Sequence, residues 1–309
     1  MSDTHCAIGL DVGGTKIAGG VVTFPSGQLL MKAMQPTAPQ RGGVAVLTEA
    51  LDLTQWLLTE ARRVNLTPMG VGVGLCELVD LDGRVTSGHT VAWQGLPVQA
   101  RFASLAPARI ESDVRAHALA EAAFGAGQGY RQFVFVTIGT GISCCWVQDG
   151  RPHAGAQGNA LILASSPLTT TCSHCGIVLH PILEEFASGP AIVARYNAQT
   201  TRTMTRAEEV LAAIETGDAI ALDVVRSAGE AVGVSVGWLV NVLDPEAVIV
   251  GGGLGSAPGV FWESLVGSAR AHIWSDESRA VPIVPAALGP DAGMIGAATA
   301  LARQLNLAL

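Results

Sequence analysis

Two segments of the chain share one pattern, in which a strand-like run meets a glycine turn and a second strand-like run follows. The first is "GLDVGGTKIAGGVV" at residues 9–22, and the second is "RQFVFVTIGTGISCCWVQDGRP" at residues 131–152. Small and β-branched residues after each turn favour a second strand over an amphipathic helix. Because the pattern recurs about one domain apart, it predicts an internal duplication and two similar α/β halves.

The first glycine turn contains residue types that suit the binding of a phosphate group. Gly13 and Gly14 can adopt backbone conformations closed to other residues, so their amides can approach an anion. Thr15 and Lys16 add donors, and Asp11 suits a divalent cation placed between a carboxylate and a phosphate. The spacing fits neither a Walker loop nor a dinucleotide fingerprint. An ordinary glycine turn is the alternative interpretation.

Composition limits the partners that the chain can have. Its 309 residues are 49% hydrophobic and 14% charged, which is typical of a well-buried globule with room for two domains. A net charge of −8 without a Lys/Arg-rich run argues against nucleic acid or an anionic membrane as partner. We expect a cytoplasmic protein, because no apolar run reaches spanning length and "MSDTHC" is not a signal peptide. Trp93, Trp146 and Trp238 lie in apolar surroundings, where we expect core positions.

Five motifs resemble those of the ROK family of bacterial sugar kinases, within the actin, hexokinase and Hsp70 superfamily. They are "DVGGTK", "TIGTG", "ILEEFASGPAI", "VIVGGGL" and "AGMIGAA", and the match covers nearly the whole chain. The resemblance implies two ribonuclease H-like α/β domains of the actin-like ATPase type around a central cleft. We place residues 1–114 and 291–309 in a small N-terminal domain and residues 115–290 in a large C-terminal domain. The family also implies a homodimer.

The resemblance implies that ATP is the phosphate donor and that Mg²⁺ accompanies it. In the family the two glycine turns hold the ATP phosphates from the two domains, and closure of the cleft on the sugar excludes water. The ATP-binding residues carried over onto this sequence are Asp11, Gly13, Gly14, Thr15, Lys16, Thr140, Gly141, Gly252 and Gly253.

The family's catalytic base is the aspartate of an Asn-Asp pair at the start of a helix, and here that pair reads Ser112-Asp113. The resemblance implies that Asp113 accepts the proton of the attacking sugar hydroxyl. Phosphoryl transfer depends on in-line positioning and charge neutralisation more than on a strong base, so a carboxylate suffices. From the residues alone, Asp113 is equally well explained as an acid at a helix N-terminus, where the macrodipole favours it.

The sugar-binding motifs depart from the family pattern. Asn159 stands where the family has a glutamate that binds sugar hydroxyls, and Ile162 stands at the position of a histidine. Glu77 replaces part of a Pro-Gly pair, and His89 replaces a sugar-contacting asparagine. The substrate-binding residues implied by the resemblance are Glu77, His89, Ser112, Asn159 and Glu184.

The exchange at position 159 removes a negative charge from the sugar site, while Glu77 adds one at another place. A relocated carboxylate favours a substrate with a positive charge, since charge-assisted hydrogen bonds are about twice as strong as neutral ones. We therefore expect an amino-hexose, such as kanosamine or glucosamine, phosphorylated at its 6-hydroxyl. The alternative is that Glu77 is a solvated surface acid and that the substrate is an ordinary hexose, as in a glucokinase or fructokinase.

The zinc segment of the family is altered to "CSHCGIVLH" in this chain. Cys172, Cys175 and His180 can supply three ligands, and a further histidine or water would supply the fourth that a structural zinc site needs. We expect a structural Zn²⁺ that holds the loop bearing Glu184. A set of reduced, packed cysteines is the alternative.

Two other classes of protein compete with the kinase hypothesis. Sugar-responsive repressors of the family carry an N-terminal helix-turn-helix, and here the first glycine turn begins too early to leave room for one. A non-catalytic sugar sensor is suggested by the changes at positions 159 and 162. Retention of the phosphoryl-transfer set argues against a sensor, which does not need it. That set is Asp11, Lys16, Thr140, Gly141 and Asp113.

Overall fold

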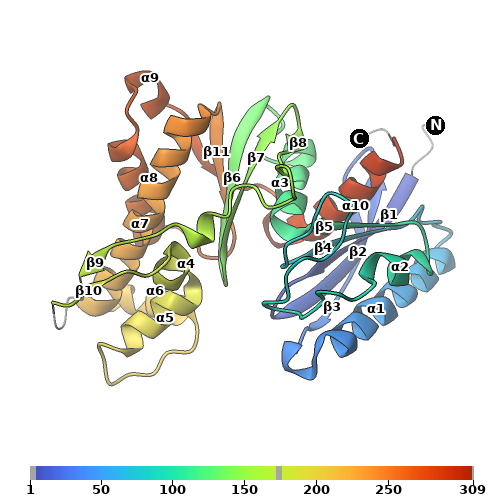
Figure 1. The fold of residues 1–309 in the computed structure, drawn as a ribbon, viewed down its shortest axis with the longest axis horizontal. Helices are drawn as coiled ribbons and strands as arrows, with labels where there is room; N and C mark the ends of the chain where they lie inside the picture. The colour runs from blue at the N-terminus through green and yellow to red at the C-terminus, as the bar shows by residue number, and fades with distance from the viewer. Residues whose placement is uncertain (1–4, 172–175, 308–309) are drawn as a thin grey trace. The chain divides into compact units, whose positions relative to one another are not determined.

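The computed structural model describes residues 5–171 and 176–307. It has two five-stranded sheets and a separate two-stranded hairpin, with helices packed against the sheets (Figure 1). This arrangement confirms the predicted α/β class. Among the helices of the described ranges, none is both long and apolar enough to cross a membrane.

The first sheet combines an antiparallel meander with two further parallel strands. Its strand order is β3–β2–β1–β4–β5. The strands are β1 (His5–Val12), β2 (Lys16–Phe24), β3 (Leu29–Pro36), β4 (Val71–Leu75) and β5 (Ala108–Ser112). The first glycine turn joins β1 to β2 as predicted. Because β1, β4 and β5 are parallel, their carboxyl ends lie at one edge of the sheet.

Helices cover both faces of this sheet. The helical segments of this part are η1 (Pro39–Arg41), α1 (Gly43–Arg63), α2 (Val98–Ala103), α3 (Asp113–Phe124), η3 (Gly289–Asp291) and α10 (Ala292–Gln304). Ile8 packs in the core on the α1 face, whereas Ala7 packs with residues of α10, as the alternation along a strand requires. α10 packs along α3 as well. A Cβ atom at Gly9 or Gly72 would collide with backbone carbonyls of α10, so both glycines permit this close approach.

The second sheet repeats the connectivity of the first. Its order is β12–β11–β6–β7–β8, and β6, β11 and β12 run parallel. The strands are β6 (Gln132–Ile138), β7 (Ile142–Gln148), β8 (Arg151–Pro152), β11 (Ala247–Gly251) and β12 (Ile283–Pro285). In chain order, the five strands take the places of β1, β2, β3, β4 and β5. The repeated order confirms the internal duplication.

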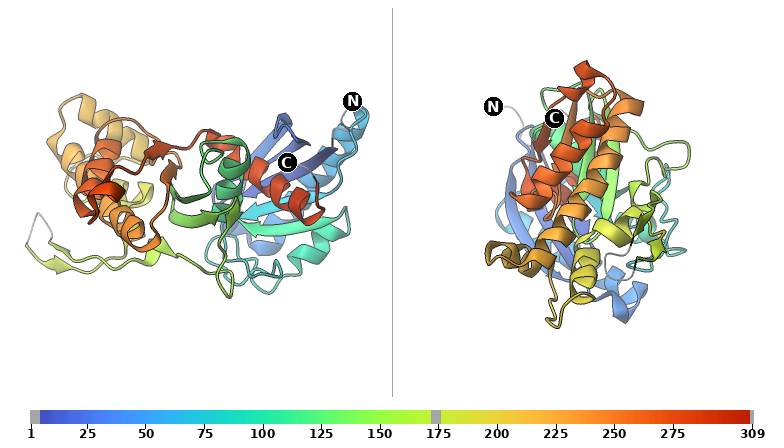
Figure 2. Two further views of the ribbon diagram at one scale, coloured as in Figure 1. Left: turned by 90° about the horizontal axis from the view of Figure 1, so that it is seen from above. Right: turned by 90° about the vertical axis from the view of Figure 1, so that its left-hand side faces the viewer.

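The remaining elements are mainly helices of the later chain. They are η2 (Leu163–Ser165), β9 (Thr170–Thr171), β10 (Val178–Leu179), α4 (Leu183–Ala187), α5 (Gly189–Asn197), α6 (Ala207–Glu215), α7 (Ala219–Leu243), α8 (Val260–His272) and α9 (Asp276–Arg279). The long helix α7 packs along α8, and Figure 2 shows the two side by side. The strands β9 and β10 form the small hairpin.

The chain divides into two compact units. The first unit comprises Met1–Arg131, Cys145–Ala160 and Ala287–Leu309, and the second comprises Gln132–Cys144 and Leu161–Ala286. Because α3 packs along α10, this division puts residues 115–131 in the first unit. The boundary expected at residue 114 puts that stretch in the C-terminal domain instead.

Two tryptophans expected in the core have different environments. Trp93 is fully buried, and its indole N–H donates a hydrogen bond to the carbonyl of Gly43 at 3.0 Å. Trp238 on α7 is 59% exposed, so its expected core position was wrong. Val234 and Val242, one turn before and after it, are exposed as well. An apolar run on a long helix therefore does not by itself identify the buried face.

Candidate active site

The carboxyl ends of three parallel strands in the first unit are aligned. Val12 of β1 pairs in register with Leu75 of β4, and Leu75 pairs with Ser112 of β5. The residues that follow these strand ends include Gly13, Cys76 and Asp113, which therefore emerge at the same edge. In α/β sheets, this edge is where ligands bind.

A buried threonine holds the glycine turn after β1 through hydrogen bonds. Within the turn, the N–H of Gly13 donates to the carbonyl of Lys16 at 3.0 Å. Thr37, which is fully buried, donates its hydroxyl to the carbonyl of Gly13 at 2.6 Å and its N–H to the carbonyl of Thr15 at 3.0 Å. The side chain of Thr15 is exposed. These bonds fix the conformation of the turn.

The carboxylate of Asp11 lies over the first turn of α10. A Cβ atom added at Gly293 would stand 2.5 Å from both Cγ and Oδ2 of Asp11, so the carboxylate occupies the space that a side chain would fill. A helix N-terminus carries partial positive charge and favours an anionic group there. Gly293 is thus a positioning residue for Asp11, and the sequence shows it only as a small residue in "AGMIGAA".

Asp113 begins α3, with Ser112 at the N-cap position. Its Oδ1 accepts a hydrogen bond from the N–H of Val114 at 2.6 Å. Burial raises the pKa of Asp113 to about 6, and the nearby carboxylate of Asp11 contributes to the rise while His117 opposes it. A carboxylate with a pKa near neutrality can accept a proton in catalysis and release it again.

Ser112 is at the N-cap of α3 but does not cap it. Its side chain makes no capping bond, and among the described residues its Oγ has no hydrogen-bond partner, although the residue is only 6% exposed. A buried hydroxyl without a protein partner is uncommon in native proteins. The position next to Asp113 suits a hydroxyl-bearing ligand.

Glu77 holds the loop of residues 87–91 from inside. It is 4% exposed, and its carboxylate accepts hydrogen bonds from the Ser87 hydroxyl and from the N–H groups of His89, Thr90 and Val91. The alternative of a solvated surface acid is therefore wrong. All four bonds are internal, so the geometry supports a role in positioning the loop.

The loop held by Glu77 borders the glycine turn. A Cβ atom at Gly14 would lie 2.7 Å from Cγ2 of Thr90, so these two residues are in contact range. The His89 side chain on the same loop is exposed. Burial, and then the charges of Asp113 and Glu77, raise the pKa of the Cys76 thiol, which locates both carboxylates near Cys76.

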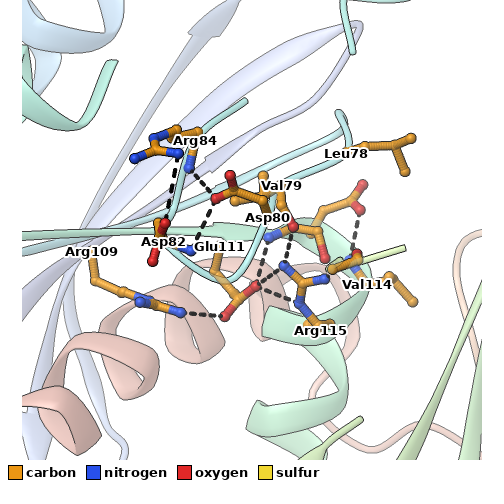
Figure 3. A network of polar contacts seen from close by, with 12 residues as sticks. Leu78, Val79, Asp80, Asp82, Arg84, Arg109, Glu111, Val114 and Arg115 are labelled. Carbon is orange, nitrogen blue, oxygen red and sulfur yellow. Dashed lines mark hydrogen bonds and ion pairs between the residues drawn. The ribbon is translucent and has the colours of Figure 1, made fainter. Parts of the chain in front are cut away.

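Arg115 is a positioning residue that sequence reasoning missed. Its guanidinium pairs with Glu111 and donates to the carbonyls of Gly158 at 2.6 Å and Val79 at 2.8 Å (Figure 3). Asn159, the next residue after Gly158, is exposed and is therefore carried on a loop that Arg115 fixes beside α3. The i,i+4 spacing of Glu111 and Arg115 was the signal in the sequence that could have identified this pair.

The second glycine turn and a second glycine cluster meet in the second unit. The turn follows β6 and the cluster follows β11, and these strands are adjacent and parallel. The carbonyl of Ile138 accepts hydrogen bonds from the N–H groups of Leu254 at 3.1 Å and Gly255 at 3.0 Å. Gly252 has a φ of +83°, and a side chain there would collide with Ile138. Thr140, Gly141 and Gly253 are exposed at this edge.

Glu184 braces the second glycine turn. It lies in the first turn of α4, and its Oε2 accepts a hydrogen bond from the N–H of Ile142 at 2.7 Å. A Cβ atom at Gly141 would lie 2.8 Å from the same oxygen. The family resemblance implies that Glu184 binds the sugar. In the structure, one of its carboxylate oxygens accepts a hydrogen bond from the residue after the glycine turn.

The described residues do not assemble the expected zinc site. Cys172 and Cys175 lie outside the described residues. The ring Nδ1 of His180, which is exposed, lies 3.3 Å from the hydroxyl of Thr169. In the ranges that the structure describes, no three His, Cys, Asp or Glu side chains form a group that could hold a metal.

Comparison with known proteins agrees with the fold. The model of the ROK family matches residues 7–304. The chain belongs to the ROK family. It is 27% identical to the glucokinase of Halalkalibacterium halodurans, over 99% of this chain and 97% of that protein. It is also 27% identical to the N-acetyl-D-glucosamine kinase of Shigella flexneri serotype 5b, over 94% of this chain and 97% of that protein.

Solved structures of ROK proteins share the fold of this ROK chain. The ROK hexokinase of Thermus thermophilus matches with a TM-score of 0.79 and 31% identity, over 97% of this chain and 99% of that chain. A ROK family glucokinase from Streptomyces griseus, solved in complex with glucose and AMPPNP, matches with a TM-score of 0.80 and 27% identity over the same shares. These matches confirm the predicted actin-like ATPase fold.

Proposed function

We propose that this ROK protein is an ATP-dependent sugar kinase that transfers the γ-phosphate of ATP to a hydroxyl group of a hexose. The observation that carries the proposal is the alignment of Asp113 with the glycine turn at Gly13 on one sheet edge, together with a pKa of about 6 for Asp113. A phosphate-binding turn and a tuned carboxylate at one edge are the parts that phosphoryl transfer needs.

In the proposed reaction Asp113 is the catalytic base. The sugar hydroxyl oxygen forms a bond to the γ-phosphorus, the bond to the bridging oxygen of ADP breaks, and the hydroxyl proton passes to the carboxylate of Asp113. Ser112 is proposed to bind a hydroxyl of the sugar, because its Oγ is buried without a partner among the described residues. Asn159 and His89 are exposed on loops of the same unit and are proposed to complete the sugar site.

The nucleotide is proposed to bind through the two glycine turns. Gly13, Gly14, Thr15 and Lys16 would hold phosphate oxygens, as would Thr140 and Gly141. Gly252 and Gly253 would lie beside the adenosine, where the lack of a side chain allows close approach. Asp11 fits Mg²⁺, because its carboxylate is fixed over Gly293 and accepts no hydrogen bond from another described residue. When bound, the ion neutralises charge on the transferred phosphoryl group.

The sugar specificity divides into two alternatives. A direct contact between Glu77 and a positively charged amino group finds little support, because the Glu77 carboxylate already accepts four hydrogen bonds. The side chain of Asn159 is uncharged, so it suits an uncharged substituent on the sugar ring, as in an ordinary hexose or an N-acetylhexosamine. We therefore propose a hexose substrate phosphorylated at its 6-hydroxyl, and an amino-hexose such as glucosamine or kanosamine is the second candidate.

A panel of sugars tests the function and the specificity together. ADP release would be measured in a coupled assay with glucose, fructose, mannose, N-acetylglucosamine, glucosamine and kanosamine, each with ATP and Mg²⁺. The proposal expects sugar-dependent ADP release, with glucose turned over at least as well as its amino analogues. Preference for an amino sugar would favour the second candidate. Absence of sugar-dependent ADP release across the panel, with sugar binding retained, would identify a non-catalytic sensor.

The zinc and the homodimer remain proposals with simple tests. Elemental analysis of the purified protein would find one equivalent of zinc if Cys172, Cys175 and His180 are ligands, and Cys172→Ser would remove it. The exposed apolar residues Trp238 and Trp274, the latter 90% exposed, support self-association. Sedimentation of the wild type as a dimer, and of Trp238→Lys as a monomer, is the result expected for an interface on this surface.

A further inference from the structure

A cavity lies in the first unit. Its volume is about 730 Å³, which is within the range of small-molecule sites. Residues of β5, α3, the β7–β8 hairpin and the C-terminal turn of α10 line it. The arginines that contribute to the lining are Arg109, Arg115, Arg151 and Arg303.

Two of these arginines share one carboxylate as an ion-pair partner. Glu111 lies between Arg109 and Arg115 and forms ion pairs with both, as Figure 3 shows. The other carboxylates of the lining are also engaged. Asp149 pairs with Arg131 at 3.2 Å, and Oδ1 of Asp80 accepts hydrogen bonds from the N–H groups of Asp82 and Arg84. No carboxylate of the lining is therefore left to pair with the remaining two arginines.

Arg151 and Arg303 are close to each other and have no acidic partner. Neither forms an ion pair with any residue in the described part of the chain. Arg303 instead donates to the carbonyl of Gly150 at 2.7 Å, which anchors its guanidinium on the hairpin that carries Arg151. Burial and the positive charge of Arg151 lower the pKa of Arg303. Two adjacent guanidinium groups repel each other unless an anion or solvent lies between them.

We propose that this cavity binds a phosphate monoester, with the phosphate group held between Arg151 and Arg303. The planar guanidinium fork matches phosphate oxygens bidentately, which makes a pair of arginines well suited to this anion. The volume exceeds what a phosphate ion alone fills, so there is room for an attached sugar-sized group. Gln304, also in the lining, supplies an acceptor for its hydroxyl groups. Arg151 and Arg303, the proposed phosphate contacts, are not among the residues assigned to the proposed kinase site.

Titration calorimetry on the full chain tests the proposal with two probes, inorganic phosphate and glucose 6-phosphate. The variants are Arg303→Gln and Arg151→Gln, and the matched control is Arg84→Gln, an exposed arginine that does not line the cavity. We expect each cavity variant to weaken binding of glucose 6-phosphate by about tenfold or more, and the control to leave it unchanged. Arg151 is exposed, and its replacement leaves the bond from Arg303 to Gly150 in place. Arg151→Gln should therefore fold normally and report on binding alone.

A third variant, Lys16→Ala, separates this cavity from the glycine turn. Binding that survives Lys16→Ala and is lost in Arg303→Gln supports the cavity. Tighter binding of glucose 6-phosphate than of phosphate identifies a phosphorylated metabolite as the ligand, and equal affinities identify free phosphate. Binding that is lost in Lys16→Ala but unchanged in both cavity variants would overturn the proposal, as would the failure of both probes to bind.

Discussion

Asp113 lies beside a second carboxylate, that of Asp11, and burial together with this repulsion raises the pKa of Asp113 to about 6. Asp11 lies near the end of β1 and Asp113 directly follows β5, and these two strands flank β4 in one sheet. In the proposed kinase they have different tasks. Asp11 remains available for Mg²⁺, while Asp113 exchanges a proton with the substrate.

The raised pKa of Asp113 predicts an acid limb in the pH profile of kcat/KM. Only the deprotonated form of Asp113 can accept a proton, so kcat/KM should fall as pH decreases through about 6, approaching a tenfold loss per pH unit. Positive charge on His117 opposes the shift, so His117→Leu should move this limb to higher pH. The control His272→Leu, on α8 of the other unit, should leave it in place. An acid limb near the ordinary Asp pKa in the wild type would contradict the account.

The hydrogen bonds to Glu77 predict a loss of stability in Glu77→Gln. The NH₂ group of the new amide would face the hydrogen-bond donors that the carboxylate accepts from, so some of these donors would be left unsatisfied. The free energy of unfolding should therefore fall by about 2–4 kcal/mol. Glu60→Gln, at an exposed ion pair with Arg63, should cost less than about 1 kcal/mol. Chemical denaturation of the two variants and the wild type measures both values.

The stabilisation by Glu77 should also depend on pH. Burial raises the pKa of Glu77, but the bonds from Ser87 and the loop amides more than offset this, and the pKa is lowered overall. Since the folded pKa is below the unfolded one, the stabilisation is present above the unfolded pKa and is lost as pH falls through the folded value. The difference in unfolding free energy between wild type and Glu77→Gln should therefore shrink in acid. A difference that stays constant down to pH 3 would contradict a charged role for Glu77.

Gly293 offers a test of how Asp11 is positioned. Gly293→Ala would place a methyl group 2.5 Å from the carboxylate and displace it, so the KM for MgATP should rise by about tenfold or more. The control is Gly267→Ala on α8, where an added Cβ meets no atom within 4 Å. Steady-state kinetics at varied MgATP measures the change. Equal KM values for the two variants would show that Asp11 is not constrained by α10.

The sequence predicted the parts of this fold that have local signatures. The glycine turn at Gly13 follows a β-branched strand and precedes another, and the same pattern at Thr140 revealed the duplication. The helix that starts at Asp113 has an acid in its first turn. These features depend on neighbours in the chain, so pattern and composition were enough to predict them.

The sequence could not predict contacts that depend on loop conformation. Glu77 reaches N–H groups twelve to fourteen residues away, along a loop without periodicity. The bond from Arg115 to Gly158 joins residues 43 positions apart. The exposed position of Trp238 could not be read from its apolar neighbours, because hydropathy does not say which face of a long helix is covered. These long-range contacts decide whether Glu77 positions a loop or binds the sugar, and where the loop that carries Asn159 lies.

The central claim is that Asp113 is the base of a sugar kinase, and one comparison tests it most directly. ADP release would be measured for the wild type and Asp113→Asn with the best sugar of the panel, with sugar affinity and thermal unfolding as controls for folding. The account predicts sugar-dependent ADP release by the wild type and a loss of about 10²–10⁴-fold in kcat in Asp113→Asn, with sugar binding retained. Undiminished turnover by a folded Asp113→Asn protein would contradict it.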